Sequence, residues 1–194
     1  MRKEHDFLGE LEVPDKVYYG VQTLRAIENF SITGSRLDVD FIQALAKVKK
    51  AAAQANMETG RLDKRIGNAL VEAAEEIIDG KFIDQFPVDP IQGGAGTSIN
   101  MNMNEVLANR ANEIAGTGLA AYQPVHPNDH VNHAQSTNDA FPTAIHVAAA
   151  IEINRHLIPA VKALRDTLDK KAQAFSLIVK IGRTHLQDAT PLTL

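Results

Sequence analysis

Glycine and small polar residues are concentrated in residues 93–102, which read Gly-Gly-Ala-Gly-Thr-Ser-Ile-Asn-Met-Asn. Glycines let the backbone approach a ligand closely, and an expected helix begins directly afterwards. The free N–H groups and the dipole of a helix N-terminus attract anions. No lysine follows the glycines and no strand is expected before them, so the segment is neither a P-loop nor a dinucleotide-binding turn. It fits either an anion-binding turn or a flexible loop with a Ser or Thr cap.

Two further segments carry groups that could bind a substrate or transfer a proton. Residues 135–139 read Gln-Ser-Thr-Asn-Asp and open another expected helix. Their uncharged donors suit a carboxylate ligand, although the same residue types also form ordinary N-caps. Residues 182–188 contain His185, which could carry a proton or donate a hydrogen bond near neutral pH. A lone loop histidine is, however, more often structural or solvent-exposed.

The run His126, His130 and His133 raises the question of a zinc site. The chain has no cysteine and no H-E-x-x-H glutamate, and Pro127 interrupts the run. We therefore expect no metal.

The whole inventory of polar groups points to one kind of chemistry. No nucleophile elbow and no pair of acidic residues poised for glycosidase chemistry occur. Hydroxyl and amide donors at helix starts, together with one histidine, suit stabilisation of a developing oxyanion. Elimination beside a carboxylate needs such donors, because removal of a proton next to the carboxylate produces an enediolate dianion.

Composition narrows the class of protein. Hydrophobic residues make up 44% of the chain and charged residues 23%, with a net charge of −4. Because no basic run occurs, we expect no nucleic-acid partner. The N-terminus lacks an apolar signal region, and no apolar stretch approaches the roughly 18 residues that span a membrane. We predict a cytoplasmic protein without membrane contact. The alanine-rich composition with only 5% aromatic residues favours packed helices.

Hydrophobic periodicity places the helices that must position these segments. Residues 1–36 lack it and are expected to be extended and irregular. One helix is predicted from the N-cap Asp38 to Gly60, and a second from Asp63 to Gly80. Charged residues on these helices, including Lys49, are interpreted as solvated faces.

The second half of the chain is predicted to contain two more helical stretches. A third helix is expected over about 99–114, after a loop at 81–97. A long helical stretch is expected from 138 to about 175, with a break or kink at Pro159. Residues 180–194 are expected to begin as a loop. The chain stops at Leu194 without a polar tail or cap, an ending that we interpret as artificial.

Several sequence blocks resemble, in order, those of one known family, the fumarase/aspartase superfamily. They are residues 6–10 and 18–23, Gly-Ala-Gly-Thr-Ser-Ile-Asn-Met-Asn at 94–102, His-Pro-Asn-Asp-His-Val-Asn at 126–132 with Gln-Ser-Thr-Asn-Asp at 135–139, and Lys-Ile-Gly-Arg-Thr-His-Leu-Gln-Asp-Ala at 180–189. The match spans nearly the whole chain, which resembles the N-terminal part of a family member.

The resemblance implies a mainly α fold. Residues 1–137 would form the N-terminal lyase domain, and residues 138–194 would begin the long-helix central bundle, here truncated. Family members are homotetramers whose active sites are shared between subunits, and they need no organic cofactor or obligatory metal. The implied chemistry is reversible deamination of L-aspartate to fumarate and ammonia by β-proton abstraction through an enediolate.

The resemblance also implies roles for individual residues. Thr97, Ser136 and Thr137 would bind the substrate β-carboxylate and stabilise the enediolate. Asn138 and His185, with Thr97, would approach the amino group, and Thr184 would contact the α-carboxylate. A second dicarboxylate site, described for fumarases, would correspond to His126, Asn128 and Asp129.

Within the family, a few positions favour the aspartase branch, chiefly Ala95 and Thr137. The pair Thr184-His185 suits a fumarase equally well, and His126-Pro127 is a fumarase-like detail. The alternatives are a fumarase, which hydrates fumarate to L-malate, and a non-catalytic fragment or assembly module. The family's catalytic base is a serine on a Gly-Ser-Ser loop, which this chain does not contain. We therefore expect these 194 residues alone to be inactive.

Overall fold

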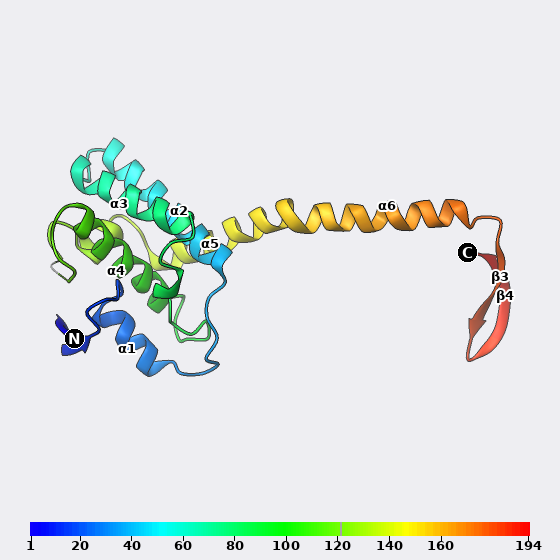
Figure 1. The fold of residues 1–194 in the computed structure, drawn as a ribbon, viewed down its shortest axis with the longest axis horizontal. Helices are drawn as coiled ribbons and strands as arrows, with labels where there is room; N and C mark the ends of the chain where they lie inside the picture. Colours follow the sequence, from blue (N-terminus) through cyan, green and yellow to red (C-terminus); the bar gives the residue numbers. More distant parts are fainter. Residues whose placement is uncertain (121) are drawn as a thin grey trace. The chain divides into compact units, whose positions relative to one another are not determined.

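A computed structural model describes residues 1–120 and 122–194 of the chain. It divides into two compact units, Met1–Ala149 and Ala150–Leu194, which are described separately below. Both contain helices as their main elements (Figure 1), which confirms the predicted mainly α fold. Among the described residues, no helix is long and apolar enough to cross a membrane.

The N-terminal segment is more regular than its sequence predicts. Strands β1 (Arg2–Asp6) and β2 (Gly9–Val13) pair as an antiparallel hairpin, and helix α1 (Val21–Asn29) follows. The expectation of an irregular entry over 1–36 is therefore wrong. These short elements escape detection because groups distant in the sequence hold them in place.

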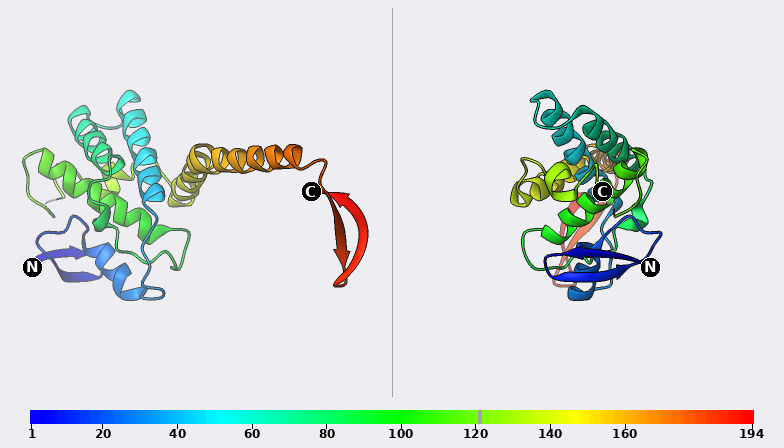
Figure 2. Two further views of the ribbon diagram at one scale, coloured as in Figure 1. Left: turned by 45° about the vertical axis from the view of Figure 1, so that its right-hand side comes forward. Right: turned by 90° about the vertical axis from the view of Figure 1, so that its left-hand side faces the viewer.

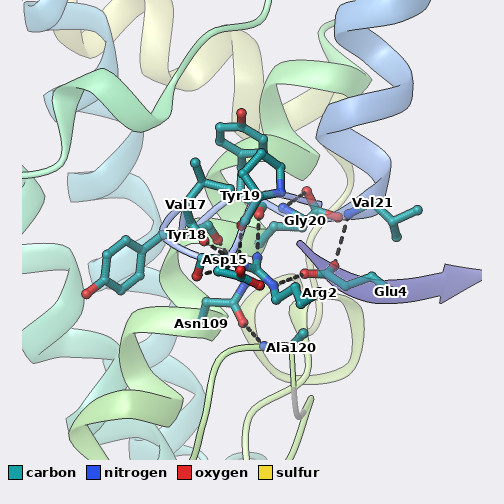
Figure 3. Close-up of polar contacts among 12 residues, drawn as sticks. Arg2, Glu4, Asp15, Val17, Tyr18, Tyr19, Gly20, Val21, Asn109 and Ala120 are labelled. Atoms are coloured by element: carbon teal, nitrogen blue, oxygen red, sulfur yellow. Dashed lines mark hydrogen bonds and ion pairs between the residues drawn. The ribbon is translucent and has the colours of Figure 1, made fainter. Parts of the chain in front are cut away.

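Arg2 is one of these groups. Its guanidinium donates to four backbone carbonyls of the next loop, those of Pro14, Asp15, Val17 and Tyr19, at 2.7 to 3.2 Å. Its Nε donates to the buried Glu4 carboxylate at 2.7 Å. Figure 3 shows the loop folded around this one side chain. The five donors of an arginine in a fixed fork suit such a role.

Helices α2 (Val39–Glu58) and α3 (Lys64–Ile78) lie side by side (Figure 1), as the periodicity predicts. Asp38 caps α2 by accepting from the backbone N–H of Asp40. Asp63 caps α3 by accepting from the next helical N–H groups. Both caps satisfy donors that an isolated helix end leaves free, which is why these boundaries can be read locally.

A short 3₁₀ turn, η1 (Ile83–Gln85), leads through a loop to helix α4 (Thr97–Ile114). Figure 2 shows α4 between α1 and the α2–α3 pair. Residues 99–109 of α4 are all buried, including polar ones: Asn100, Asn102, Asn104, Glu105 and Asn109. Helix α4 is thus the central element of the first unit, and its buried polar groups hold the surrounding loops.

The first unit ends with a five-residue π-helical turn, η2 (Pro127–Val131), and most of helix α5 (Thr137–Glu152). The second unit contains a π-helical turn, η3 (Ile153–Leu157), and helix α6 (Ile158–Ala174). The helix interruption predicted at Pro159 is thus the π-helical turn η3, which ends just before the proline. Proline cannot donate to the carbonyl four residues earlier, so the local helix geometry must change.

Strands β3 (Val179–Thr184) and β4 (Gln187–Thr193) form a second antiparallel hairpin, where a loop was expected. Its two-residue turn is His185-Leu186, with φ of 51° and 62°. Such turns usually contain Asn or Gly, so the sequence carries no turn signal here. The domain boundary expected at 137/138 stays a prediction.

Candidate functional site

The glycine-rich segment ends at the first turn of α4, where Thr97 is exposed. Gly96 precedes it with φ of 79°, and a Cβ at this position would overlap the ring of Phe141 in α5. Only glycine combines this backbone conformation with so close an approach. Because Gly96 has no side chain, the start of α4 packs directly against α5.

The second polar segment opens α5 beside it. Ser136 Oγ accepts from the Asn138 backbone N–H at 3.2 Å, and both residues are exposed. The half-buried Thr137 Oγ1 accepts from Asn100 Nδ2 at 3.0 Å. Because Asn100 lies in the first turn of α4, the structure brings the segment of Thr97 and residues 136–138 together.

This juxtaposition defines what the site can do chemically. Two helix N-termini with free N–H groups present a favourable field to an anion. Among the described residues, the hydroxyl of Thr137 donates to no acceptor, while its oxygen accepts from Asn100. Its hydrogen is therefore available for a ligand oxygen. The arrangement suits a carboxylate, and the individual binding roles of Thr97, Ser136, Thr137 and Asn138 stay predictions.

Sequence reasoning missed Lys49, and its interpretation as a solvated residue is wrong. The side chain is 2% exposed, and its Nζ donates to Asn132 Oδ1 and Gln135 Oε1, both at 3.0 Å. Among the described residues, no carboxylate forms an ion pair with it. Burial lowers the pKa of Lys49 from 10.5 to about 7. A signal existed, because Lys49 lies one and two turns beyond the buried Leu45 and Ile42.

The proposed second dicarboxylate site has a defined geometry. His126 caps η2, and its Nδ1 accepts from the backbone N–H groups of Asn128 and Asp129 at 3.3 and 3.2 Å. Neutral His126 would then carry its proton on Nε2. His126 and Asn128 line a cavity of about 390 Å³, whose other walls include His5 and Tyr122. The structure thus places two of the three predicted residues at one cavity, and Asp129 Oδ2 lies 3.4 Å from His126 Nδ1.

The three-histidine run does not converge on a common point. His130 Nδ1 accepts from the backbone N–H of His126 at 2.8 Å, which occupies its lone pair. Burial lowers the pKa of His130, favouring the neutral ring. Within the described ranges, no group of three His, Cys, Asp or Glu residues could hold a metal ion.

Thr184 and His185 belong to the second unit. Thr184 ends β3 opposite Gln187, and His185 forms the hairpin turn with Leu186. Both side chains are exposed. Their roles toward a substrate stay predictions.

Glu105 is a second buried ionisable group without a predicted role. Its carboxylate accepts from the backbone N–H groups of Gly20, Gln22 and Thr23 and from the Thr23 hydroxyl, at 2.6 to 3.0 Å. Burial raises the pKa of Glu105 despite these donors. Its carboxylate links α4 to the first turn of α1, whose free N–H groups attract negative charge.

The helical fold and the paired donor segments define the class. Residues 9–194 match the sequence profile of a family described as Lyase. The chain belongs to this lyase family, which includes fumarases and aspartases, and it corresponds to the N-terminal portion of the family fold.

Relatives with two different names share this portion. The chain is 70% identical to a class II fumarate hydratase of Neisseria meningitidis and 57% identical to an aspartate ammonia-lyase of a Bacillus species. Both matches cover 100% of this chain, but 42% and 41% of those proteins.

Solved structures agree with this assignment. A fumarate lyase:delta crystallin structure from Brucella melitensis matches with a TM-score of 0.95 at 48% identity. A class II fumarase from Schistosoma mansoni matches with a TM-score of 0.93 at 39% identity. These matches cover the whole of this chain and 44% and 41% of the two solved chains, respectively.

Proposed function

We propose that the protein contributes a carboxylate-binding half-site to a lyase that eliminates a leaving group from a C4 dicarboxylate and releases fumarate. The observation that carries the proposal is the contact between two helix starts rich in hydroxyl and amide donors, at Thr97 and at residues 136–138. Membership of the lyase family supports it.

The proposed reaction has two bond-breaking steps. A base removes a proton from the carbon next to one carboxylate, and the electron pair moves into that carboxylate as an enediolate dianion. Thr97, Ser136 and Thr137 then donate to its oxygens, which carry more charge than in the substrate. The pair returns to form the double bond as the leaving group departs. By family resemblance, Thr184 and His185 act at the other end of the substrate, and the base lies on a segment that this chain lacks.

Water is the first candidate for the leaving group, which would make the reaction the reversible hydration of fumarate to L-malate. The 70% identity to the Neisseria fumarate hydratase supports it. Ammonia is the second, with L-aspartate as the substrate. The aspartase-like residues Ala95 and Thr137 and the 57% identity to the Bacillus aspartate ammonia-lyase support that candidate.

The experiment supplies L-malate and L-aspartate separately to the protein as its gene encodes it, and follows fumarate by ultraviolet absorbance. Thr137→Val is expected to lower kcat/KM about 100-fold, by removal of one donor to the oxyanion. Thr59→Val is the matched control, because Thr59 is exposed at the end of α2 and its hydroxyl donates to carbonyls of its own helix. Failure of both substrates, or full activity of Thr137→Val, would refute the proposal.

The 194 residues alone are expected to show no turnover of either substrate, because the Gly-Ser-Ser loop is absent. Purified chain and full-length enzyme can be compared in the same fumarate assay. Robust turnover by the chain would show that the base lies within it.

The assembly follows the family as a proposal: a cytoplasmic homotetramer, without cofactor, in which bundle helices join the subunits and complete each other's active sites. Helix α6 supports this, because every residue of it is exposed in the single chain. Its apolar residues Val161, Leu164 and Leu168 recur at helical spacing and are 55%, 60% and 58% exposed. Such a stripe needs a partner surface.

A further inference from the structure

Three donors converge on one amide oxygen behind the candidate site. Asn132 Oδ1 accepts from Lys49 Nζ at 3.0 Å, from Asn100 Nδ2 at 3.0 Å and from Asn104 Nδ2 at 3.3 Å. Lys49 comes from α2 and the two asparagines from α4. Lys49 also bonds to Gln135, directly before the Ser-Thr-Asn segment. The cluster therefore ties α2 and α4 to the turn that leads into α5.

This cluster is not arranged for stability. A buried ammonium group loses its hydration, and two amide oxygens compensate for this less well than a carboxylate would. The side-chain oxygens of the buried Asn100 and Asn104 also lack a partner among the described residues. Buried polar groups that fail to satisfy one another are retained mainly where a function requires them.

The bonds of Asn100 show what the cluster controls. An amide nitrogen carries two hydrogens, and Asn100 Nδ2 donates to Asn132 Oδ1 and to Thr137 Oγ1. Turning the amide over would place its oxygen against the acceptor Asn132 Oδ1 and break that bond, so the amide nitrogen stays toward Thr137. Thr137 must then act as the acceptor in this pair, which directs its own hydrogen elsewhere.

We propose that Lys49 is a positioning residue that, by holding Asn132 and Gln135, fixes Asn100 and so orients the Thr137 hydroxyl to donate to the substrate carboxylate. This inference rests on the proposed function of the site. Lys49 acts through other residues, because its side chain is 2% exposed and its ammonium already bonds to two side chains.

The test is a double-mutant cycle in the protein as its gene encodes it, with the better of L-malate and L-aspartate as substrate. Lys49→Met is expected to lower kcat/KM about 10- to 100-fold, because a misdirected donor loses most of its effect. In a Thr137→Val background, Lys49→Met should lower kcat/KM less than about twofold, because the hydroxyl through which Lys49 acts is already absent.

Lys50→Met is the matched control, since Lys50 is the next residue of α2 and forms a surface ion pair with Glu75 at 2.8 Å. It should leave kcat/KM within about twofold of the wild type. Lys49→Gln keeps a donor without the charge, and should retain more activity than Lys49→Met. It also serves as the test variant if Lys49→Met does not fold.

Three outcomes are distinguishable. If Lys49→Met and Thr137→Val lower kcat/KM independently, so that the losses multiply, the positioning role is refuted while the proposed function stands. Full activity of Lys49→Met and Lys49→Gln refutes it as well. If the wild type uses neither substrate, or Thr137→Val is fully active, the proposed function fails, and the inference fails with it.

Discussion

Two deeply buried charged groups of the first unit have very different surroundings. The Glu105 carboxylate accepts from four donors around the start of α1. Among the residues that the structure describes, the Lys49 ammonium donates to two amide oxygens. A buried charge with a full set of partners can hold structure together, whereas one with few partners reduces stability. We therefore assign Glu105 a structural role and Lys49 a functional one.

Glu105 and Glu4 also explain why residue 20 is glycine. A Cβ on Gly20 would lie 2.6 Å from Glu4 Oε2 and 2.8 Å from Glu105 Oε1. Gly20→Ala is expected to lower the free energy of unfolding by about 1–3 kcal/mol, because neither buried carboxylate can move without losing its donors. Urea unfolding measures the loss. Gly118→Ala is the control, since a Cβ there meets no atom of the described residues within 4 Å. Equal losses for both variants would contradict the explanation.

Lys49 should leave a signature in the pH dependence of stability. Its pKa in the folded protein is about 7, below the ordinary value of 10.5, so between these values the unfolded chain binds more protons. Stability therefore rises with pH through this window. The wild type should gain stability relative to Lys49→Met as pH increases from about 6 to about 9, measured by urea unfolding. The corresponding difference for Lys50→Met should stay flat, and a flat difference for Lys49→Met would count against the buried charge.

Helix α4 is bonded to the surrounding loops of the first unit through its amide side chains. Asn102 donates to Gln85 O, and Asn109 bonds to Tyr18 O and to the N–H of Ala120. Asn112 bonds to both the N–H and the carbonyl of Val125. Figure 3 shows Asn109 in this role beside the Arg2 loop. Each amide forms hydrogen bonds with loop backbone groups that would otherwise be buried without partners. These same hydrogen bonds hold α4, the helix that carries Thr97, in place.

The contact between α4 and α5 depends on Gly96. Gly96→Ala is expected to lower both stability and kcat/KM, because the added Cβ overlaps the Phe141 ring and displaces Thr97. Gly60→Ala is the control: its φ is also positive, at 71°, but no atom of the described residues would lie within 4 Å of the added Cβ. It should show only the backbone strain of about 1 kcal/mol.

A second substitution separates crowding from strain. Phe141→Ala removes the ring, and it should restore part of the activity lost in Gly96→Ala. If Gly60→Ala and Gly96→Ala are equally impaired in urea unfolding and in the fumarate assay, backbone strain alone explains the effect. The contact with α5 would then be unimportant.

In the molecule as a whole, helix α6 carries an exposed stripe of apolar residues. Its apolar stripe has no counterpart within the second unit, where no residue of this helix is buried. The proposed tetramer would bury the stripe between copies, as coiled-coil seams do.

Leu164→Glu tests that assembly in the protein as its gene encodes it. A charge in the middle of the stripe should shift the mass from tetramer to smaller species, measured by light scattering after gel filtration. Activity should fall in parallel, because active sites shared between subunits would separate. Lys162→Glu places the same residue on the opposite side of α6 and should leave the tetramer intact. An unchanged mass for Leu164→Glu would exclude α6 as the assembly surface.

Features that depend on neighbouring residues could be predicted from the sequence. Helices α2 and α3 could be bounded because Asp38 and Asp63 cap them locally and their apolar residues repeat with helical spacing. The donor segments at 93–102 and 135–139 could be recognised at helix starts for the same reason, and their order along the chain indicated the lyase family. These signals are short-range, so no tertiary information was needed.

The tertiary structure alone decided the rest, because the groups concerned lie far apart in the sequence. Arg2 and Glu105 hold β1 and α1, which have little periodicity of their own. The partners of the buried Lys49, Asn132 and Gln135, lie more than 80 residues away in the sequence. The link from Asn100 to Thr137 joins the two donor segments into one site. Residue types indicated which groups could bind a carboxylate, and packing decided which of them lie together.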